Sequence, residues 1–129
     1  MANIKQTEEF EGVSAAQLYD ALMSSKKHAD FTGAGANISS KVGGDFTAWD
    51  DYIEGKNIEL EAGKKIVQKW RASDWPEGEW SEVTYVFTDT KDGCELQFEQ
   101  TGVPSDMVKD VEQGWVDYYW EPLRKYFKK

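Results

Sequence analysis

Residues 65–80 read KIVQKWRASDWPEGEW, and this stretch of the sequence decides the fold. A strand-like run at 65–71 leads into a turn that contains Trp75 and Pro76, and a second strand-like run starts at Trp80. Three of the six tryptophans and one of the three prolines lie here. Two strands joined by a short turn pair side by side, so the centre of the chain predicts antiparallel β-sheet.

More strands are predicted on both sides of this hairpin. Residues 80–88 and 94–101 have the composition of strands, and Asp92 with Gly93 supplies the turn between them. Near the start of the chain, residues 3–11 read as a strand with one apolar and one polar face. These runs are short and separated by turn residues, which indicates an antiparallel sheet of several strands.

A further hairpin is predicted in the Gly-rich segment before the central one. A short strand at about 36–40 precedes the sequence FTAW, and the hairpin turn lies near Asp50 and Asp51. Gly55 is expected to break the second strand, because glycine weakens a strand interior.

Two helices complete the pattern. Ser14 and Gln17 form a capping box, and a helix follows it to about Met23. From Pro104 onward a long C-terminal helix is predicted, in which large apolar residues recur at helical spacing: Trp115, Tyr118, Tyr119, Leu123 and Tyr126. This order gives an α+β fold, a curved antiparallel β-sheet wrapped around the C-terminal α-helix, and residues 1–129 are expected to form a single domain.

The charge balance argues against several classes of partner. The chain has 24 acidic and 15 basic residues, a formal net charge of -9, which opposes binding to nucleic acid or to an anionic membrane surface. No apolar run approaches the roughly 20 residues that cross a bilayer. No targeting segment is visible at the start, so a cytoplasmic location is expected.

The residues that usually carry catalysis are scarce. His28 is the single histidine, and we expect it in a solvated loop after the first helix. Cys94, the single cysteine, lies on the apolar side of a strand and is expected to be packed in the core. Glycine-rich phosphate loops and nucleophile elbows are absent from the sequence. We therefore expect no enzymatic activity, no metal and no cofactor.

The aromatic residues have two interpretations. Those expected on facing surfaces of the sheet and the C-terminal helix line a cavity for an apolar ligand in one interpretation and fill the space completely in the other. The candidate lining residues are Trp49, Trp70, Trp115, Tyr119 and Trp120.

The turn after residue 71 also has two interpretations. Pro76 at the second position and Gly78 at the fourth suit a type I turn that begins at Trp75. Trp75 either anchors an interface at the tip of this turn or folds back beneath it. Asp74 and Glu77 flank the ring with negative charge, which suits a basic partner surface. Asp74, Trp75 and Glu77 are the candidate partner-binding residues.

Several of these motifs occur in the same order in a known family. KIVQKWR, DWPEG, EVTYVF, GVP and, at residues 114–123, GWVDYYWEPL together resemble the C-terminal domain of the activator of heat-shock protein 90 ATPase. The resemblance covers nearly the whole chain, from Ile4 to Tyr126.

The resemblance implies a START-like, helix-grip fold, binding to heat-shock protein 90 and an influence on its ATPase cycle, with no chemistry by the domain itself. In two-domain members, an N-terminal domain grips the middle segment of the chaperone and the C-terminal domain contacts its dimerised N-terminal domains. Neither that first domain nor its Asn-rich, Trp-His-Trp signature is found in this sequence. START-like relatives also imply an alternative function, the binding of a hydrophobic small molecule.

Overall fold

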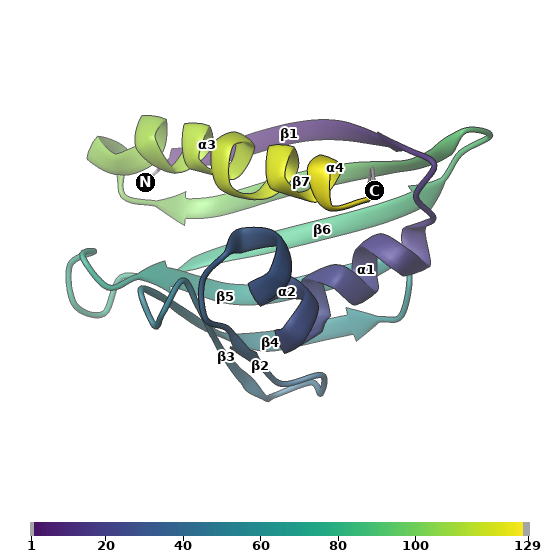
Figure 1. The fold of residues 1–129 in the computed structure, drawn as a ribbon. Helices are drawn as coiled ribbons and strands as arrows, with labels where there is room; N and C mark the ends of the chain where they lie inside the picture. The colour runs from purple at the N-terminus through teal and green to yellow at the C-terminus, as the bar shows by residue number, and fades with distance from the viewer. Residues whose placement is uncertain (1, 128–129) are drawn as a thin grey trace.

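Seven strands form one antiparallel sheet in the computed structural model, which describes residues 2–127. The sheet order is β1-β7-β6-β5-β4-β3-β2 (Figure 1). The strands are β1 (Ala2–Glu11), β2 (Asn37–Ile38), β3 (Asp45–Ala48), β4 (Ile53–Glu61), β5 (Lys65–Ala72), β6 (Ser81–Asp89) and β7 (Gly93–Val103). Every predicted strand is present, with bounds that differ by a few residues.

The central hairpin forms as predicted. β5 pairs antiparallel with β6, with Trp70 opposite Ser81 at the turn end. Along β6 and β7 buried and more exposed residues alternate, so each strand turns one apolar face toward the helices. Figure 1 shows the helices on the same side of the sheet, and one continuous apolar core lies between the two layers.

Two short helices follow β1. The capping box of Ser14 and Gln17 forms as predicted and starts α1 (Ala15–Met23). The sequence prediction missed α2 (Ser25–Thr32), which begins at a second cap where the Ser24 side chain accepts a hydrogen bond from the backbone N–H of Lys27. The segment that was expected to be a loop is therefore a helix packed on the core.

The prediction that Gly55 breaks its strand is wrong. β4 continues through Gly55 to Glu61, and the glycine is required by close packing. A Cβ atom at this position would lie 1.9 Å from the carbonyl oxygen of Lys69 and 2.5 Å from the ring of Phe46. A glycine inside a strand can thus mark a close approach of neighbouring groups and not a strand end.

The predicted turn near Asp50 and Asp51 is confirmed, and its backbone is unusual. Trp49, Asp50 and Asp51 all have positive φ, at 54°, 55° and 74°. Asp50 Oδ1 accepts a hydrogen bond of 2.8 Å from the backbone N–H of Gly35, which ties the turn to the segment after α2. Three consecutive left-handed residues are costly, so this turn depends on the contacts around it.

The C-terminal helix is long, as predicted, but it is not uniform. It consists of η1 (Ser105–Met107), α3 (Val108–Trp115), the π-helical segment η2 (Val116–Trp120) and α4 (Glu121–Phe127). The wider π turn stacks Trp115 and Trp120, five residues apart, with ring centroids 5.6 Å apart and planes at 20°. Both rings are therefore buried by one stretch of helix, and π turns of this kind are frequent at functional sites.

One arginine fastens this helix to the edge of the sheet. The guanidinium of Arg124 donates to Glu8 Oε1 at 2.6 Å and to the carbonyl of Glu9 at 3.1 Å, and it lies 4.8 Å from the centroid of the Phe10 ring. Within residues 2–127, no helix is both long and apolar enough to cross a membrane.

Candidate ligand pocket between the sheet and the C-terminal helix

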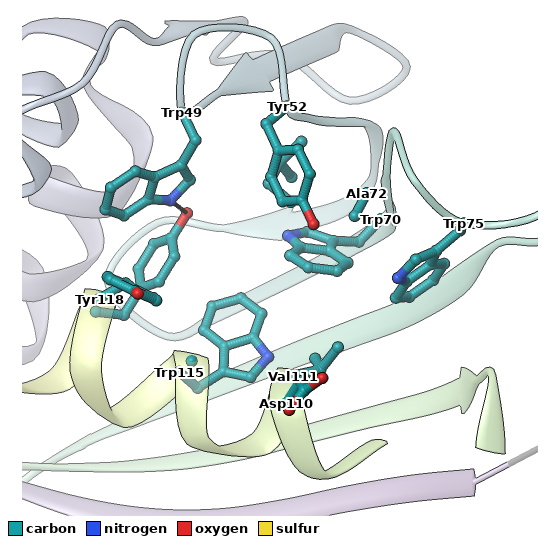
Figure 2. Close-up of a pocket in the computed structure, with 12 residues that line it drawn as sticks. Trp49, Tyr52, Trp70, Ala72, Trp75, Asp110, Val111, Trp115 and Tyr118 are labelled. Carbon is teal, nitrogen blue, oxygen red and sulfur yellow. Dashed lines mark hydrogen bonds between the residues drawn. The ribbon is translucent and has the colours of Figure 1, made fainter. Parts of the chain in front are cut away.

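A pocket of about 560 Å³ lies between the sheet and the C-terminal helix, at the end of the sheet where the β5–β6 turn lies (Figure 2). Three parts of the fold build it: the loop between β3 and β4, the end of β5 with its turn, and one face of α3 and η2. Its lining residues are Trp49, Tyr52, Ile53, Trp70, Ala72, Trp75, Asp110, Val111, Gly114, Trp115, Tyr118 and Tyr119.

Local structure explains why these side chains meet. Trp70 and Ala72 alternate with Arg71 along β5, so both point toward the helix. On the helix, Val111, Trp115 and Tyr118 lie at spacings of four and three residues, which places them on one face. The left-handed turn carries Trp49 and Tyr52, and Figure 2 shows both rings reaching from that loop toward the helix.

The rings form a continuous chain of contacts around the pocket. Trp75 meets Trp70 edge to face with centroids 5.5 Å apart, and Trp70 lies 5.4 Å from Trp115. Trp115 in turn contacts Tyr119 at 4.6 Å, and Tyr119 contacts Trp49 at 6.2 Å. Tilted and edge-to-face pairs of this kind add stability beyond the burial of their area. The wall is therefore built mainly from aromatic side chains that support one another.

Tyr119 is the polar centre of the inner wall. Its hydroxyl group lies 3.0 Å from His28 Nε2 and accepts a hydrogen bond of 3.3 Å from Trp49 Nε1. Burial raises the pKa of Tyr119 above its ordinary value, although the hydrogen bond from Trp49 opposes this shift. The hydroxyl group is thus neutral at physiological pH and links α2, the β3–β4 loop and the C-terminal helix.

The prediction that His28 lies in a solvated loop is wrong. His28 belongs to α2, is 4% exposed and contacts the rings of Phe31 and Tyr119. Burial lowers its pKa from 6.5 to about 4, so the ring is neutral at physiological pH. Its Nδ1 atom is buried without a hydrogen-bond partner among the described residues. Cys94, by contrast, is buried in the core as predicted, and burial raises the pKa of its thiol to about 11.

The outer rim of the pocket is open to solvent. Tyr52 is 45% exposed and Tyr118 is 57% exposed. The Tyr52 hydroxyl group donates a hydrogen bond of 2.8 Å to Asp74 Oδ1, and burial together with this bond raises the pKa of Tyr52 to about 12. The bond joins the β3–β4 loop to the β5–β6 turn. A ligand therefore has a direct path from solvent to the inner aromatic wall.

Four of the five predicted cavity residues lie at this pocket: Trp49, Trp70, Trp115 and Tyr119. Trp120 does not. It is fully buried on the other side of Trp115, where its Nε1 donates a hydrogen bond of 2.6 Å to Gln6 Oε1. The structure does not agree with the interpretation in which the aromatic rings fill the space completely, because a pocket remains between them.

The structure places the ring of Trp75 beneath the turn. Trp75 is 4% exposed, packs against Trp70 and lines the pocket, so the ring is not presented at the tip. The expected type I turn beginning at Trp75 is also wrong. The backbone N–H of Glu79 bonds to the carbonyl of Pro76, and Gly78, third in that turn, has a φ of 81°. This position favours glycine in a type II turn.

Arg71 explains why the ring stays in place. Its guanidinium donates hydrogen bonds to the carbonyl groups of Trp75, Pro76 and Glu79 and lies 3.8 Å from the Glu54 carboxylate. These bonds hold the turn against β5 from the side opposite the pocket. Asp74 and Glu77 remain exposed on its outside.

Sequence reasoning missed several lining residues: Tyr52, Ile53, Ala72, Asp110, Val111, Gly114 and, as a pocket residue, Tyr118. The helical spacing of Val111, Gly114, Trp115 and Tyr118 was a usable signal, because it marks one face of the helix. The sequence had no comparable signal that the β3–β4 loop lines the pocket, because the position of this loop depends on its left-handed backbone. Among the described residues there is no group of three or more His, Cys, Asp or Glu side chains that could hold a metal ion.

Gly114 offers a test of the pocket wall. It is the second-last residue of α3, where the C-terminal helix continues into η2, and a Cβ atom added there would meet only Tyr118 Cδ2, at an ordinary distance of 3.7 Å. Gly114→Ala is therefore expected to raise the free energy of unfolding by about 0.5–1 kcal/mol, measured by urea denaturation, because alanine is the better helix former.

Gly78→Ala is the matched control. Nothing lies within 4 Å of the added Cβ atom, but φ is 81°, so the same substitution is expected to destabilise the protein by about 1 kcal/mol. Equal effects of both substitutions would contradict this description of the helix and the turn.

The fold and the pocket define a class of protein. A curved antiparallel sheet that grips a C-terminal helix, with a pocket between the two, is a START-like, helix-grip domain, as predicted. The family model described as "Activator of Hsp90 ATPase homolog 1-like protein" matches residues 12–128. The chain therefore belongs to this family.

Curated relatives agree with the family match. The human activator of 90 kDa heat shock protein ATPase homolog 1 is 33% identical over 114 residues, which covers 88% of this chain and 34% of the relative. The Dictyostelium discoideum homologue is 35% identical over 113 residues, 87% of this chain and 29% of the relative. The chain thus spans about a third of the length of these proteins.

Solved structures show the same fold. An HSP90 activator from Plasmodium falciparum matches with a TM-score of 0.92 at 24% identity, covering 98% of this chain and 96% of that one. The Aha1 dimer from Colwellia psychrerythraea matches with a TM-score of 0.79 at 16% identity, covering 94% and 92%.

Proposed function

We propose that this protein is a cytoplasmic co-chaperone that binds heat-shock protein 90 and modulates its ATPase activity without catalysing a reaction itself, and that its 129 residues act as one START-like domain. One observation carries the proposal: membership of the activator family over residues 12–128, with relatives that are named as activators of this ATPase. The chain corresponds to a third of those relatives, so its binding has to be measured on the chain itself.

The outside of the β5–β6 turn is the proposed contact surface. Asp74 and Glu77 are exposed there, and Glu77 makes no ion pair with any residue that the structure describes. The formal net charge of -9 adds to a negative field that attracts a basic partner surface. Trp75 contributes from beneath, because its buried ring keeps the turn in one conformation.

A nuclear magnetic resonance titration tests this surface. Adding unlabelled heat-shock protein 90 to the isotope-labelled chain is expected to shift or broaden the backbone amide signals of residues 74–78 before those elsewhere. Unchanged signals at the highest chaperone concentration would overturn the proposal.

Charge reversal gives the matched comparison. Glu77→Lys is expected to weaken binding by roughly two- to tenfold, mainly through slower association. Glu61→Lys makes the same change at the exposed end of β4, beside the start of β5 and far along that strand from the β5–β6 turn, and is expected to leave the affinity unaltered. Equal losses in both variants would assign the effect to net charge and not to this turn.

The pocket supports a second candidate function, the binding of a hydrophobic small molecule. Its volume of about 560 Å³ and largely aromatic wall match the usual size and character of small-molecule sites. Mass spectrometry of organic extracts of the purified protein tests it, with Gly114→Leu as a variant whose added side chain narrows the pocket without removing a ring. A ligand that is retained by the unmodified chain and lost from this variant is the expected result. Equal retention by both would place the ligand elsewhere.

A further inference from the structure

The composition of the pocket wall points to a particular kind of ligand. Seven of its twelve lining residues are aromatic: Trp49, Tyr52, Trp70, Trp75, Trp115, Tyr118 and Tyr119. One lining residue is charged, Asp110, and it is an acid. Among the lining residues that the structure describes there is no lysine, arginine or histidine. Figure 2 shows Asp110 and Trp115 on the helix, facing Trp70 across the pocket.

This wall favours positive charge over negative charge. The face of an aromatic ring carries partial negative charge, and a cation within about 6 Å of several rings is attracted by each of them. Asp110 adds a full negative charge at the rim, and its carboxylate makes no hydrogen bond or ion pair with any described residue. Asp74 lies beside the same rim through its hydrogen bond to Tyr52.

Arg71, the basic residue beside the pocket on β5, already interacts with other groups of the protein. Arg71 lies on the strand between two lining residues, but its guanidinium is directed to three carbonyl oxygens and Glu54 on the far side of the turn. It does not line the pocket. Arg71 therefore does not neutralise the negative charge of the pocket wall, and a cationic ligand can interact with that charge.

From these contacts we infer that the pocket binds an apolar organic cation, a quaternary or tertiary ammonium compound with a hydrophobic body. The inference rests on the second proposed function and names its ligand class. The hydrophobic body packs between Trp70, Trp75 and Trp115, and the ammonium group lies toward Asp110 and the exposed rings of the rim. The pocket volume of about 560 Å³ lies within the usual range for drug-sized ligands.

Two probes of the same shape test the role of charge. Benzyltrimethylammonium has a quaternary nitrogen atom at the position where neopentylbenzene has a quaternary carbon atom. The two compounds therefore have nearly the same shape and volume, but only the first is charged. Binding is followed by the indole N–H signals of Trp49, Trp70, Trp75 and Trp115. The cation is expected to bind roughly tenfold more tightly than the neutral compound, since each close ring adds to the attraction.

Two substitutions then separate charge from shape. Asp110→Asn keeps the size of the side chain and is expected to weaken binding of the cation roughly two- to fivefold, with no change for neopentylbenzene. Asp92→Asn removes an equal charge in the exposed β6–β7 turn and is expected to leave both affinities unchanged. Gly114→Leu is expected to weaken binding of both compounds.

The outcomes distinguish the inference from the function on which it rests. If neopentylbenzene binds as tightly as the cation, or if Asp110→Asn has no effect, the cation preference is overturned while the hydrophobic pocket stands. If neither compound shifts an indole signal, both are overturned.

Discussion

Replacing Trp120 with alanine is expected to lower the free energy of unfolding by about 3–5 kcal/mol, the largest effect of a single truncation that we expect in this chain. The ring is fully buried, stacks on Trp115 and meets Phe98 edge to face at 5.3 Å. The substitution removes this volume and leaves the Gln6 side chain without the indole N–H group that binds it at 2.6 Å. A cavity and a lost hydrogen bond therefore act together.

Urea denaturation at neutral pH measures this effect, and Tyr118→Ala is the control. Tyr118 belongs to the same π-helical segment but is 57% exposed, so its truncation is expected to cost less than about 1 kcal/mol. Similar losses in the two variants would show that Trp120 does not hold the helix on the sheet as the structure describes.

Acidification from pH 7.5 to pH 4 is expected to destabilise the protein by about 3 kcal/mol through His28. Burial lowers the folded-state pKa of this histidine from 6.5 to about 4. Between these two values the unfolded chain binds a proton that the folded chain does not, so stability falls as the pH falls through this window. At pH 7.5 and above the ring is almost entirely neutral in both states, so its contribution is nearly constant.

His28→Phe isolates this contribution, because it keeps a ring beside Phe31 and Tyr119 but has no proton to bind. Carboxyl groups titrate in both proteins, so the difference between their stability profiles belongs to His28. Unfolding free energies measured from pH 7.5 to pH 4 are expected to fall less steeply for the variant. Parallel profiles would mean that the pKa of His28 is the same in the folded and the unfolded state.

The features that were predicted correctly depend on residues that lie close together along the sequence. The capping box of Ser14 and Gln17 and the alternation in β7 are local patterns, and both form where they were expected. The turn near Asp50 and Asp51 also formed as predicted. Short-range preferences determine the cap and the alternation, so both can be derived without knowledge of the tertiary structure. The position of the turn was predictable in the same way, but its left-handed backbone depends on tertiary contacts.

The features that were missed depend on contacts between distant parts of the chain. His28 follows two lysines and has a polar sequence context, yet Tyr119, 91 residues later, provides its hydrogen bond. Trp75 is turned inward because Trp70 offers a ring surface and Arg71 holds the turn. Gly55 is fixed by the ring of Phe46 on the next strand. None of these contacts has a signature in the local sequence.

The pocket has one feature that could be predicted from the sequence and one that could not. The aromatic residues on β5 and on the C-terminal helix were predicted to face each other, and Trp70 and Trp115 do so at 5.4 Å. Asp110, which we infer to determine the charge preference of the pocket, is one of 24 acidic residues, and nothing in the sequence distinguishes it from the others. Its significance depends on the rings that the fold brings around it.

The central proposal, binding to heat-shock protein 90, is tested most directly by calorimetry of this chain with the full-length chaperone, with and without a non-hydrolysable ATP analogue. A protein that accelerates ATP hydrolysis has to bind the hydrolysis-competent state more tightly than the resting state. We therefore expect saturable binding that is tighter when the analogue is present. The absence of measurable heat and of any shift in hydrodynamic size, under both conditions, would contradict the proposal.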